Sequence, residues 1–296
     1  NESSFSREYE SEWSGDVENA FFSAERFDDH RVLLQPEYEF SGRSGKNSYY
    51  VVSVDVGRKG CTTEVCVIKV TPENNGSTRK TLVNLYSYED EHFENQAIYL
   101  KKLFYKYKAR TLVIDANGLG IGLVDYMVKA QIDPESGDVL PDFGVINDEE
   151  GFYKKFRTGS TEYDAMYLVK ANAPINTEAY VYCQGQMNSG KIKFLIDEQQ
   201  AKVKLMSTKK GQEMDASKRA TELMPFTLTT ILREQMLNLV EENEGVNIIL
   251  KRVSRTVPKD RFSAFIYGMY YIKQEEDKGR KKKRRNIKDM MFFSSR

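Results

Sequence analysis

The first strongly apolar stretch of the chain runs from Tyr49 to Gly57 and is built from β-branched and aromatic residues, with no proline and no internal glycine. A continuous run of this kind is typical of a strand that is buried on both faces. Two more runs, 64–70 and 80–86, follow after short polar turns. The pattern therefore predicts an antiparallel meander of three strands.

The period then changes to that of a helix. Apolar side chains recur at positions i, i+4, i+7, i+11 and i+14, namely Phe93, Ala97, Leu100, Phe104 and Tyr107. A short apolar run at 111–115, a second helix through Leu123 and Met127, and a short run at 143–146 complete the order β-β-β-α-β-α-β. We expect an α/β fold in which helices flank a mixed sheet.

The second half of the chain has a weaker pattern. It predicts helices at 161–171, 176–188, 226–242 and 258–273, strands at 191–196 and 246–250, a mobile loop at 207–219, and a tail from Gln274 onward. Glycine, serine and lysine at 42–48 indicate a linker. We therefore expect an N-terminal segment, 1–46, a main domain, 47–275, and a basic C-terminal tail, 276–296.

The charges are balanced overall, with 44 basic and 44 acidic residues, but they are unevenly distributed. Eight of the eleven residues from Lys278 to Lys288 are basic and none is acidic, so the rest of the chain has a net charge of −8. An acidic body with a basic end fits a carboxylate site combined with a contact to a polyanion.

Several classes of protein are disfavoured by composition. The three cysteines are not closely paired and there are only two histidines, His30 and His92. A Cys/His zinc site and a Ser-His-Asp site are therefore not expected, and the odd cysteine count fits a reducing compartment. No apolar run approaches the roughly 18 residues of a membrane span, and no signal-peptide pattern opens the chain.

Carboxylates remain as the candidate chemistry. Asp55 ends the first strand, Asp115 ends the strand after the first predicted helix, and Asp260 lies at the start of the last helix, behind Pro258. Each acid has a structural alternative, because a strand-end Asp can accept backbone N–H bonds and an Asp in a first helical turn favours the helix dipole. Together, three acids from separate elements predict a site for two Mg²⁺ or Mn²⁺ ions, as in phosphodiester hydrolysis.

Two glycine-rich segments do not support a nucleotide-binding loop. Gly185 to Lys191 resembles a P-loop, but Ile192 stands where Ser or Thr is required, and the segment follows a helix instead of a strand. The segment Gly118 to Gly122 lacks the lysine and instead predicts a close backbone approach at a helix start.

Basic residues gather around the third acid and in the tail, where they are candidates for contact with DNA phosphates. They are Lys251, Arg252, Arg255, Lys259, Arg261, Lys281, Lys282, Lys283, Arg284 and Arg285.

These stretches resemble the C-terminal nuclease domain of the large terminase subunit of tailed bacteriophages, a branch of the ribonuclease-H-like superfamily. The resemblance lies in 52–57, 112–120 and 259–268, and in the aromatic N-terminal segment around Trp13, which looks like the end of the preceding packaging ATPase domain. It spans nearly the whole chain and is vague between about 151 and 237.

The resemblance implies a ribonuclease-H-like mixed sheet and a Mg²⁺- or Mn²⁺-dependent endonuclease that cuts concatemeric viral DNA during genome packaging. Asp55, Asp115 and Asp260 match the family's catalytic, metal-binding acids. Ser263 stands where many relatives carry a second Asp, which leaves a fourth carboxylate ligand unassigned. Double-stranded DNA, the ATPase domain, the small terminase subunit and the portal are the implied partners, and the host cell cytoplasm is the implied location.

Two other classes of function remain open from the sequence. An actin-like or sugar-kinase ATPase would share the strand order and the Asp-x-Gly turn, although no adenosine site is recognisable. A DNA-binding packaging module without catalysis is the other alternative. A metal-dependent nicking assay separates both from the nuclease.

Overall fold

The computed structural model describes residues 19–42, 47–58, 60–74, 76–89, 92–159 and 164–293. The predicted aromatic segment around Trp13 and part of the 42–48 linker lie outside these ranges. The helices are α2 (Ala24–Asp29), α3 (Phe93–Lys106), α4 (Leu119–Met127), the 3₁₀ turn η1 (Tyr153–Phe156), α5 (Ala173–Asn188), α6 (Glu198–Met206), α7 (Lys209–Glu213), α8 (Ala216–Leu237) and α9 (Asp260–Phe293).

One large mixed sheet has the strand order β1-β10-β4-β3-β2-β5-β9-β8. Its strands are β1 (Arg31–Leu33), β2 (Tyr49–Asp55), β3 (Thr63–Pro72), β4 (Thr78–Tyr88), β5 (Thr111–Asp115), β8 (Gly144–Val145), β9 (Asp164–Val169) and β10 (Ile192–Leu195). Strand β3 is antiparallel to both of its neighbours, whereas β2, β5, β9 and β8 are parallel. The predicted meander and the predicted mixed α/β sheet are both confirmed.

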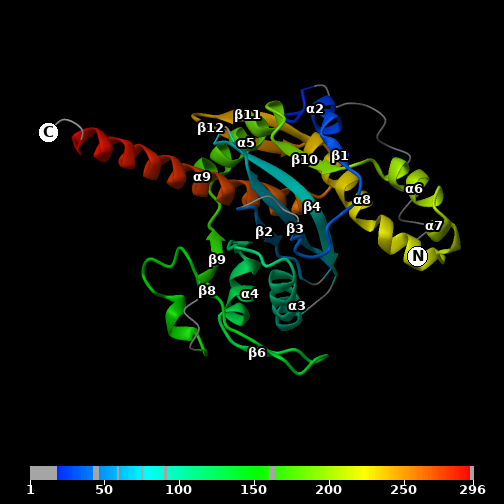
Figure 1. Cartoon of the computed structure of the whole chain (residues 1–296), viewed down its shortest axis with the longest axis horizontal. Helices are drawn as coiled ribbons and strands as arrows, with labels where there is room; N and C mark the ends of the chain where they lie inside the picture. The colour runs from blue at the N-terminus through cyan, green and yellow to red at the C-terminus, as the bar shows by residue number, and fades with distance from the viewer. Residues whose placement is uncertain are drawn as a thin grey trace.

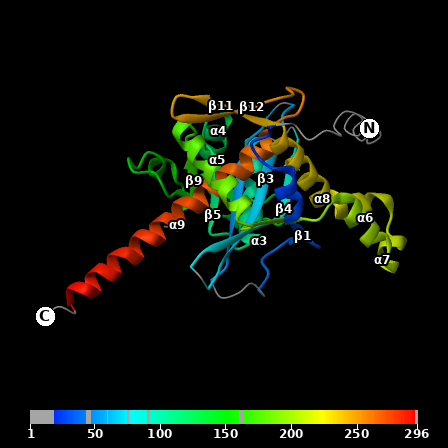
Figure 2. The same cartoon turned by 90° about the horizontal axis from the view of Figure 1, so that it is seen from above.

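Two small hairpins lie outside the main sheet. One joins β6 (Gln131–Ile132) to β7 (Val139–Leu140), and the other joins β11 (Leu239–Glu244) to β12 (Asn247–Arg252). The second hairpin lies over α5 and leads into the start of α9 (Figure 2).

Helices cover the two faces of the sheet and divide the core into two layers. Helices α3 and α4 bury one face together with Val52 and Val54, while α9, α5 and α8 bury the other (Figure 1). Because side chains alternate across a strand, residues of β2 such as Val51 and Val52 belong to different layers. This alternation determines which acids meet α9.

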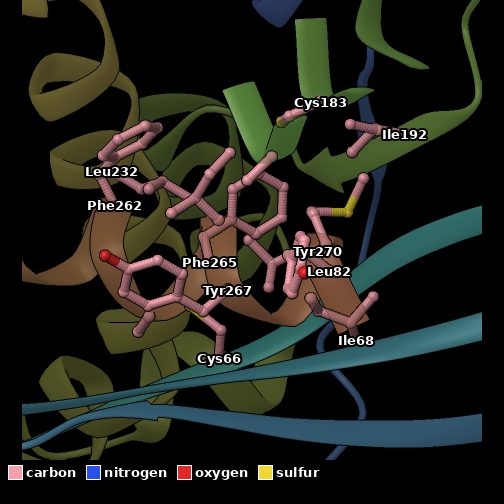
Figure 3. Packing of buried hydrophobic residues seen from close by; sticks show 14 of the residues in the cluster. Cys66, Ile68, Leu82, Cys183, Ile192, Leu232, Phe262, Phe265, Tyr267 and Tyr270 are labelled. Carbon is pink, nitrogen blue, oxygen red and sulfur yellow. The ribbon is translucent and has the colours of Figure 1, made fainter. Parts of the chain in front are cut away.

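Helix α9 crosses the sheet in close contact. Phe262 and Phe265 pack among Cys66, Ile68 and side chains of α5 and α8 (Figure 3). At Gly268 a Cβ atom would lie only 2.9 Å from the Ser53 Cβ, so glycine permits this approach. Burial of aromatic side chains in such a layer is a main source of folding free energy.

Part of the N-terminal segment belongs to this core. Ser23 caps α2 by accepting a bond from the Arg26 N–H, and Phe22 and Phe27 are buried in the α9 layer. Phe27 stacks on Phe194 of β10 with a ring-centroid distance of 4.0 Å. Packing of this segment on the main domain is therefore seen for the described residues from 19 onward.

Two predicted elements are wrong, and the predicted helix 226–242 is wrong at its end, because α8 stops at Leu237 and 239–242 belong to β11. The predicted helix 161–171 is the strand β9 over Asp164–Val169, because its apolar residues fill the sheet between β5 and β8. The predicted loop 207–219 contains α7 and the start of α8. Thr208 and Asp215 begin these helices as N-caps, accepting bonds from the N–H groups of Gly211 and Lys218.

The last helix is much longer than predicted. It continues from the expected end at Lys273 to Phe293 and projects from the body (Figures 1 and 2). The residues here favour a helix, and the ion pairs Lys273–Asp277 and Glu276–Arg280 have i,i+4 spacing. The tail expected from Gln274 is therefore a helical arm, while the domain boundary at 275 stays a prediction.

Candidate active site

The pleat of the sheet places three acids on the face that α9 covers. Asp55 shares its side of β2 with Val51, which is in the α9 layer, and Asp115 shares its side of β5 with Val113. Strands β2 and β5 are parallel and in register up to Val54 and Ile114, so the two acids end neighbouring strands. Glu64 also lies on this face, because it is the direct partner of Asp55 on the antiparallel strand β3.

Helix α9 brings a fourth acid, Asp260, as its first residue. The helix begins here because the loop before it is held in place. The Asn238 side chain donates to the Ser254 carbonyl and accepts from the Ser254 N–H, and Gln235 of α8 accepts a bond of 2.9 Å from the Phe262 N–H. An unpaired N–H of the first helical turn is thereby satisfied by a side chain.

The electrostatics show that these acids act on one another. Burial, followed by the carboxylates of Asp260 and Asp115, raises the pKa of Asp55 to about 7. Glu64 raises it further, and Lys259 lowers it. Burial also raises the pKa of Asp115, against the lowering effects of the Asn117 N–H and of Lys259. The structure therefore brings Asp55, Asp115 and Asp260 together, as the sequence predicted, with Lys259 within electrostatic range.

A close contact between strand and helix fixes the position of Asp115. Its Oδ1 accepts a bond of 3.0 Å from the Asn117 N–H. Gly118 has a positive φ of 60°, and a Cβ on Gly120 would lie 1.7 Å from the Asp115 carbonyl oxygen. The segment Gly118 to Gly122, for which the sequence predicted a close backbone approach, thus allows α4 to start directly against β5.

A buried ion pair borders the site. The Arg261 Nη2 donates to the Glu64 Oε1 at 2.8 Å, and the side chains are 7% and 4% exposed. Sequence reasoning missed Glu64. The available signal was that a three-strand meander pairing 49–55 with 64–70 places an acid opposite Asp55 in an otherwise apolar strand.

The donor set fits hard divalent cations. The four acids offer only carboxylate oxygens, which Mg²⁺ and Mn²⁺ prefer, and their mutual repulsion is the kind that a cation relieves. Within the described ranges, no group of three or more histidine, cysteine or acidic side chains is already arranged to hold an ion. The acids are close enough to perturb one another, and metal binding stays a prediction.

The residues predicted to bind phosphate differ in their exposure to solvent. Lys251, Arg252, Arg255 and Lys259 are exposed along the segment that runs from β12 into α9. Lys251 pairs with Glu242, and the Arg252 Nη1 donates to the carbonyls of Arg255 and Val257.

Arg261 does not share this exposure. Its burial and its bond to Glu64 remove it from the surface, so we assign it to the acidic cluster instead of to a phosphate contact. Lys281 is exposed on the arm, and the backbone of 282–285 continues the same helix.

The chain is similar to solved structures of viral large terminases. The nuclease of thermophilic phage G20c with bound magnesium is 14% identical, with a TM-score of 0.47 over 86% of this chain and 98% of that chain. The nuclease domain of Thermus phage P74-26 is 13% identical, with a TM-score of 0.43 over 86% and 94%. The large terminase of bacteriophage HK97 is 8% identical, with a TM-score of 0.46 over 85% of this chain and 43% of that chain.

These structures belong to the family that the sequence motifs resemble. No protein-family model and no curated protein sequence matches the chain.

Proposed function

We propose that this chain is the nuclease part of a viral large terminase subunit. In this proposal it is a Mg²⁺- or Mn²⁺-dependent endonuclease that cuts concatemeric double-stranded DNA during genome packaging in the host cell cytoplasm. Its partners in the full assembly are the ATPase domain, the small terminase subunit and the portal.

One observation carries the proposal. Asp55, Asp115 and Asp260 come from two strands and a helix far apart in sequence, and burial together with the carboxylates of Asp260 and Asp115 raises the pKa of Asp55 to about 7. Like charges gathered at a partly buried position cost folding free energy, so they indicate a function that needs them. Exposed basic residues beside this cluster supply a surface for a polyanion.

Each residue has a role in the proposed cleavage. Asp55, Asp115 and Asp260 would hold the ions, which when bound stabilise the attacking and leaving oxygens of a phosphodiester. Asp55 ends β2, the strand between β3 and β5, so it would hold the ions from a position between Glu64 and Asp115. Lys259 is exposed and acts electrostatically on Asp55 and Asp115, so it is placed to orient the scissile phosphate.

The test is nicking of supercoiled plasmid by the full chain with Mg²⁺ or Mn²⁺. We expect metal-dependent nicking that Asp55→Asn reduces by about 100-fold or more, whereas Asp125→Asn, at an exposed acid of α4, leaves the rate unchanged. Circular dichroism verifies that both variants are folded. Full nicking by folded Asp55→Asn would contradict the nuclease proposal, and ATP hydrolysis without nicking would favour the ATPase alternative.

Absence of nicking, together with salt-sensitive DNA binding that does not depend on Asp55, would favour the non-catalytic packaging module. Exposed basic residues alone are enough for that kind of binding.

A further inference from the structure

Glu64 is a buried acid that precedes the buried apolar residues 65–68 of strand β3. It lies in β3 directly opposite Asp55, and the whole residue is 3% exposed. A buried carboxylate is expensive unless its oxygens are bonded or hold a metal. Its bonding therefore shows what the residue is for.

The two oxygens of Glu64 are bonded very unequally. Oε1 accepts three bonds, from the Thr62 hydroxyl at 2.8 Å, the Ser87 hydroxyl at 3.0 Å and the Arg261 Nη2 at 2.8 Å. Oε2 is buried and has no hydrogen-bond partner in the part of the chain that the structure describes. One oxygen is thus saturated, and the other is left without a ligand inside the protein.

This asymmetry differs from the usual arginine–carboxylate pair. Arginine and a carboxylate commonly form two parallel bonds that use both oxygens. Here Arg261 donates to Oε1 through Nη2, while its Nε is buried and has no hydrogen-bond partner among the described residues. The backbone of Arg261 is also held, since its carbonyl accepts a contact from the Cys66 thiol.

The Glu64 side chain, which carries the free Oε2, lies on the same face of the sheet as the other acids. Glu64, Cys66 and Ile68 alternate onto the α9 face of β3, which is the face that carries Asp55 on β2. Glu64 is the register partner of Asp55, and Arg261 joins this region through its bond to the Glu64 Oε1. Ser263 supplies no carboxylate, whereas β3 offers Glu64 directly opposite Asp55.

We propose that Glu64 is the fourth carboxylate of the metal site, with Oε2 as the oxygen that binds the cation, and that Arg261 is a positioning residue that holds Glu64 through Oε1. This inference rests on the proposed function. Four carboxylates near the two cations Lys259 and Arg261 leave a net formal charge of −2, which suits divalent ions.

The experiment is a titration of the full chain with Mn²⁺, in which free Mn²⁺ is measured by electron paramagnetic resonance without any DNA. Glu64→Gln retains the shape of the side chain and an acceptor for the three donors, but it replaces the free oxygen by an amide. We expect about 10- to 100-fold weaker Mn²⁺ binding, the range seen when groups around a metal are removed.

The matched control is Asp142→Asn. Asp142 is also a buried carboxylate bonded to an arginine, with the Arg157 Nε at 2.7 Å, but it packs outside the α9 layer. This variant should be less stable and retain the Mn²⁺ affinity of the parent chain. A general decrease in stability is thereby separated from the removal of a ligand.

Three further variants cover the case in which Glu64→Gln leaves Arg261 unpaired and the protein unfolds. The double variant Glu64→Gln/Arg261→Met removes both charges at similar volume, which buried ion pairs often tolerate. It should fold and bind Mn²⁺ weakly. Arg261→Lys should bind Mn²⁺ more tightly than Arg261→Met, because a retained cation still holds Glu64.

The outcomes separate this inference from the proposed function. If Asp55→Asn abolishes Mn²⁺ binding while Glu64→Gln, or the double variant, binds like the parent chain, Glu64 is only structural and the inference is overturned. If the parent chain itself binds no Mn²⁺ and does not nick plasmid, the proposed function fails and the inference fails with it.

Discussion

At the scale of single residues, the environment of Asp55 changes an ordinary carboxyl into one that titrates near neutrality. Burial is the largest cause, and the neighbouring acids Asp260 and Asp115 are next. A pKa raised in the folded state means that folding is favoured by protonation. In the metal-free protein, ionised Asp55 is therefore expected to lower the free energy of unfolding, and this penalty depends on pH.

The penalty has a defined direction. The pKa of Asp55 rises from 3.8, its ordinary value, to about 7 in the folded protein. The stability that folding gains from protonated Asp55 is therefore fully present below pH 3.8, and it is lost as the pH rises through 7. Asp55→Asn removes this pH-dependent destabilisation. Without metal, we expect Asp55→Asn to raise the Tm at pH 8 by roughly 2–6 °C, and by much less at pH 4.

Thermal unfolding in chelator at a series of pH values measures this difference, with Asp125→Asn as the exposed control. Addition of Mn²⁺ should reverse the order, because only the parent chain gains stability by binding the ion. A Tm difference that does not change with pH would contradict the explanation by charge repulsion.

Lys259 provides a second test at this scale. It is exposed, precedes Asp260 and lowers the pKa of Asp55 and Asp115. Lys259→Ala should reduce the single-turnover cleavage rate at saturating DNA by about tenfold or more, since a cation at the scissile phosphate acts on the chemical step.

Lys251→Ala is the matched variant, because Lys251 is exposed on the same segment but pairs with Glu242. It should change DNA affinity slightly and leave the saturated rate unchanged. Equal saturated rates for both variants and the parent chain would show that Lys259 is only a surface residue.

At the scale of elements, the contact between α4 and β5 holds one acid of the site. Helix α4 begins so close to the strand that Gly120 has no room for a side chain beside the Asp115 carbonyl. The position of Asp115 therefore depends on a glycine five residues further along the chain.

Gly120→Ala tests this contact. The added Cβ would lie 1.7 Å from the Asp115 carbonyl oxygen, so the helix or the strand must shift. We expect a decrease of about 1–3 kcal/mol in the free energy of unfolding, the range for overpacking, together with weaker Mn²⁺ binding.

Gly185→Ala is the control, because Gly185 lies in α5 with no atom within 4 Å of the added Cβ. It should be neutral or stabilise by up to about 1 kcal/mol. Denaturant unfolding and the Mn²⁺ titration compare the two variants, and similar behaviour would refute the close-contact explanation.

At the scale of the whole molecule, positive charge is concentrated on an arm that leaves an acidic body. The arm is held at its base by the buried Lys80, whose Nζ lies 2.7 Å from the Glu276 Oε1, and by Lys273 with Glu178. Beyond these contacts, Lys278, Arg280 and Lys281 are exposed. A rigid basic helix of this kind is suited to contact DNA phosphates away from the acids.

Deletion of 278–296 tests the division between arm and body. The truncated chain retains the ion pairs of Lys80 and Lys273, so its Tm should be unchanged. DNA affinity should fall, and the slope of log affinity against log salt should flatten by about 0.9 for each phosphate that the arm neutralises in the parent chain.

The saturated cleavage rate should be nearly unaffected by this deletion, because the arm lies beyond the part of α9 that packs on the sheet. Single-turnover rates at several salt concentrations distinguish binding from chemistry. A large fall in the saturated rate would show that the arm takes part in cleavage.

The sequence by itself determined the meander at the centre of the sheet and pointed to the three acids Asp55, Asp115 and Asp260. Strands 49–57, 64–70 and 80–86 were predictable because a strand buried on both faces needs a continuous apolar run, whatever surrounds it. An acid that ends such a run is conspicuous for the same reason. The order of β2 to α4 and the later strand β8 followed from the changes in period, whereas the β6–β7 hairpin between them was not predicted.

Only the tertiary structure decided the rest. The segment 164–169 forms a strand because it pairs with β5 on one side and β8 on the other, and the local sequence pattern does not encode these partners. Glu64 and Arg261 are separated by 197 positions, and they meet because the start of α9 lies against the antiparallel pair β2–β3 where β2 ends and β3 begins. Burial, which changes an arginine from a surface cation into a partner for a carboxylate, is a property of packing between distant segments.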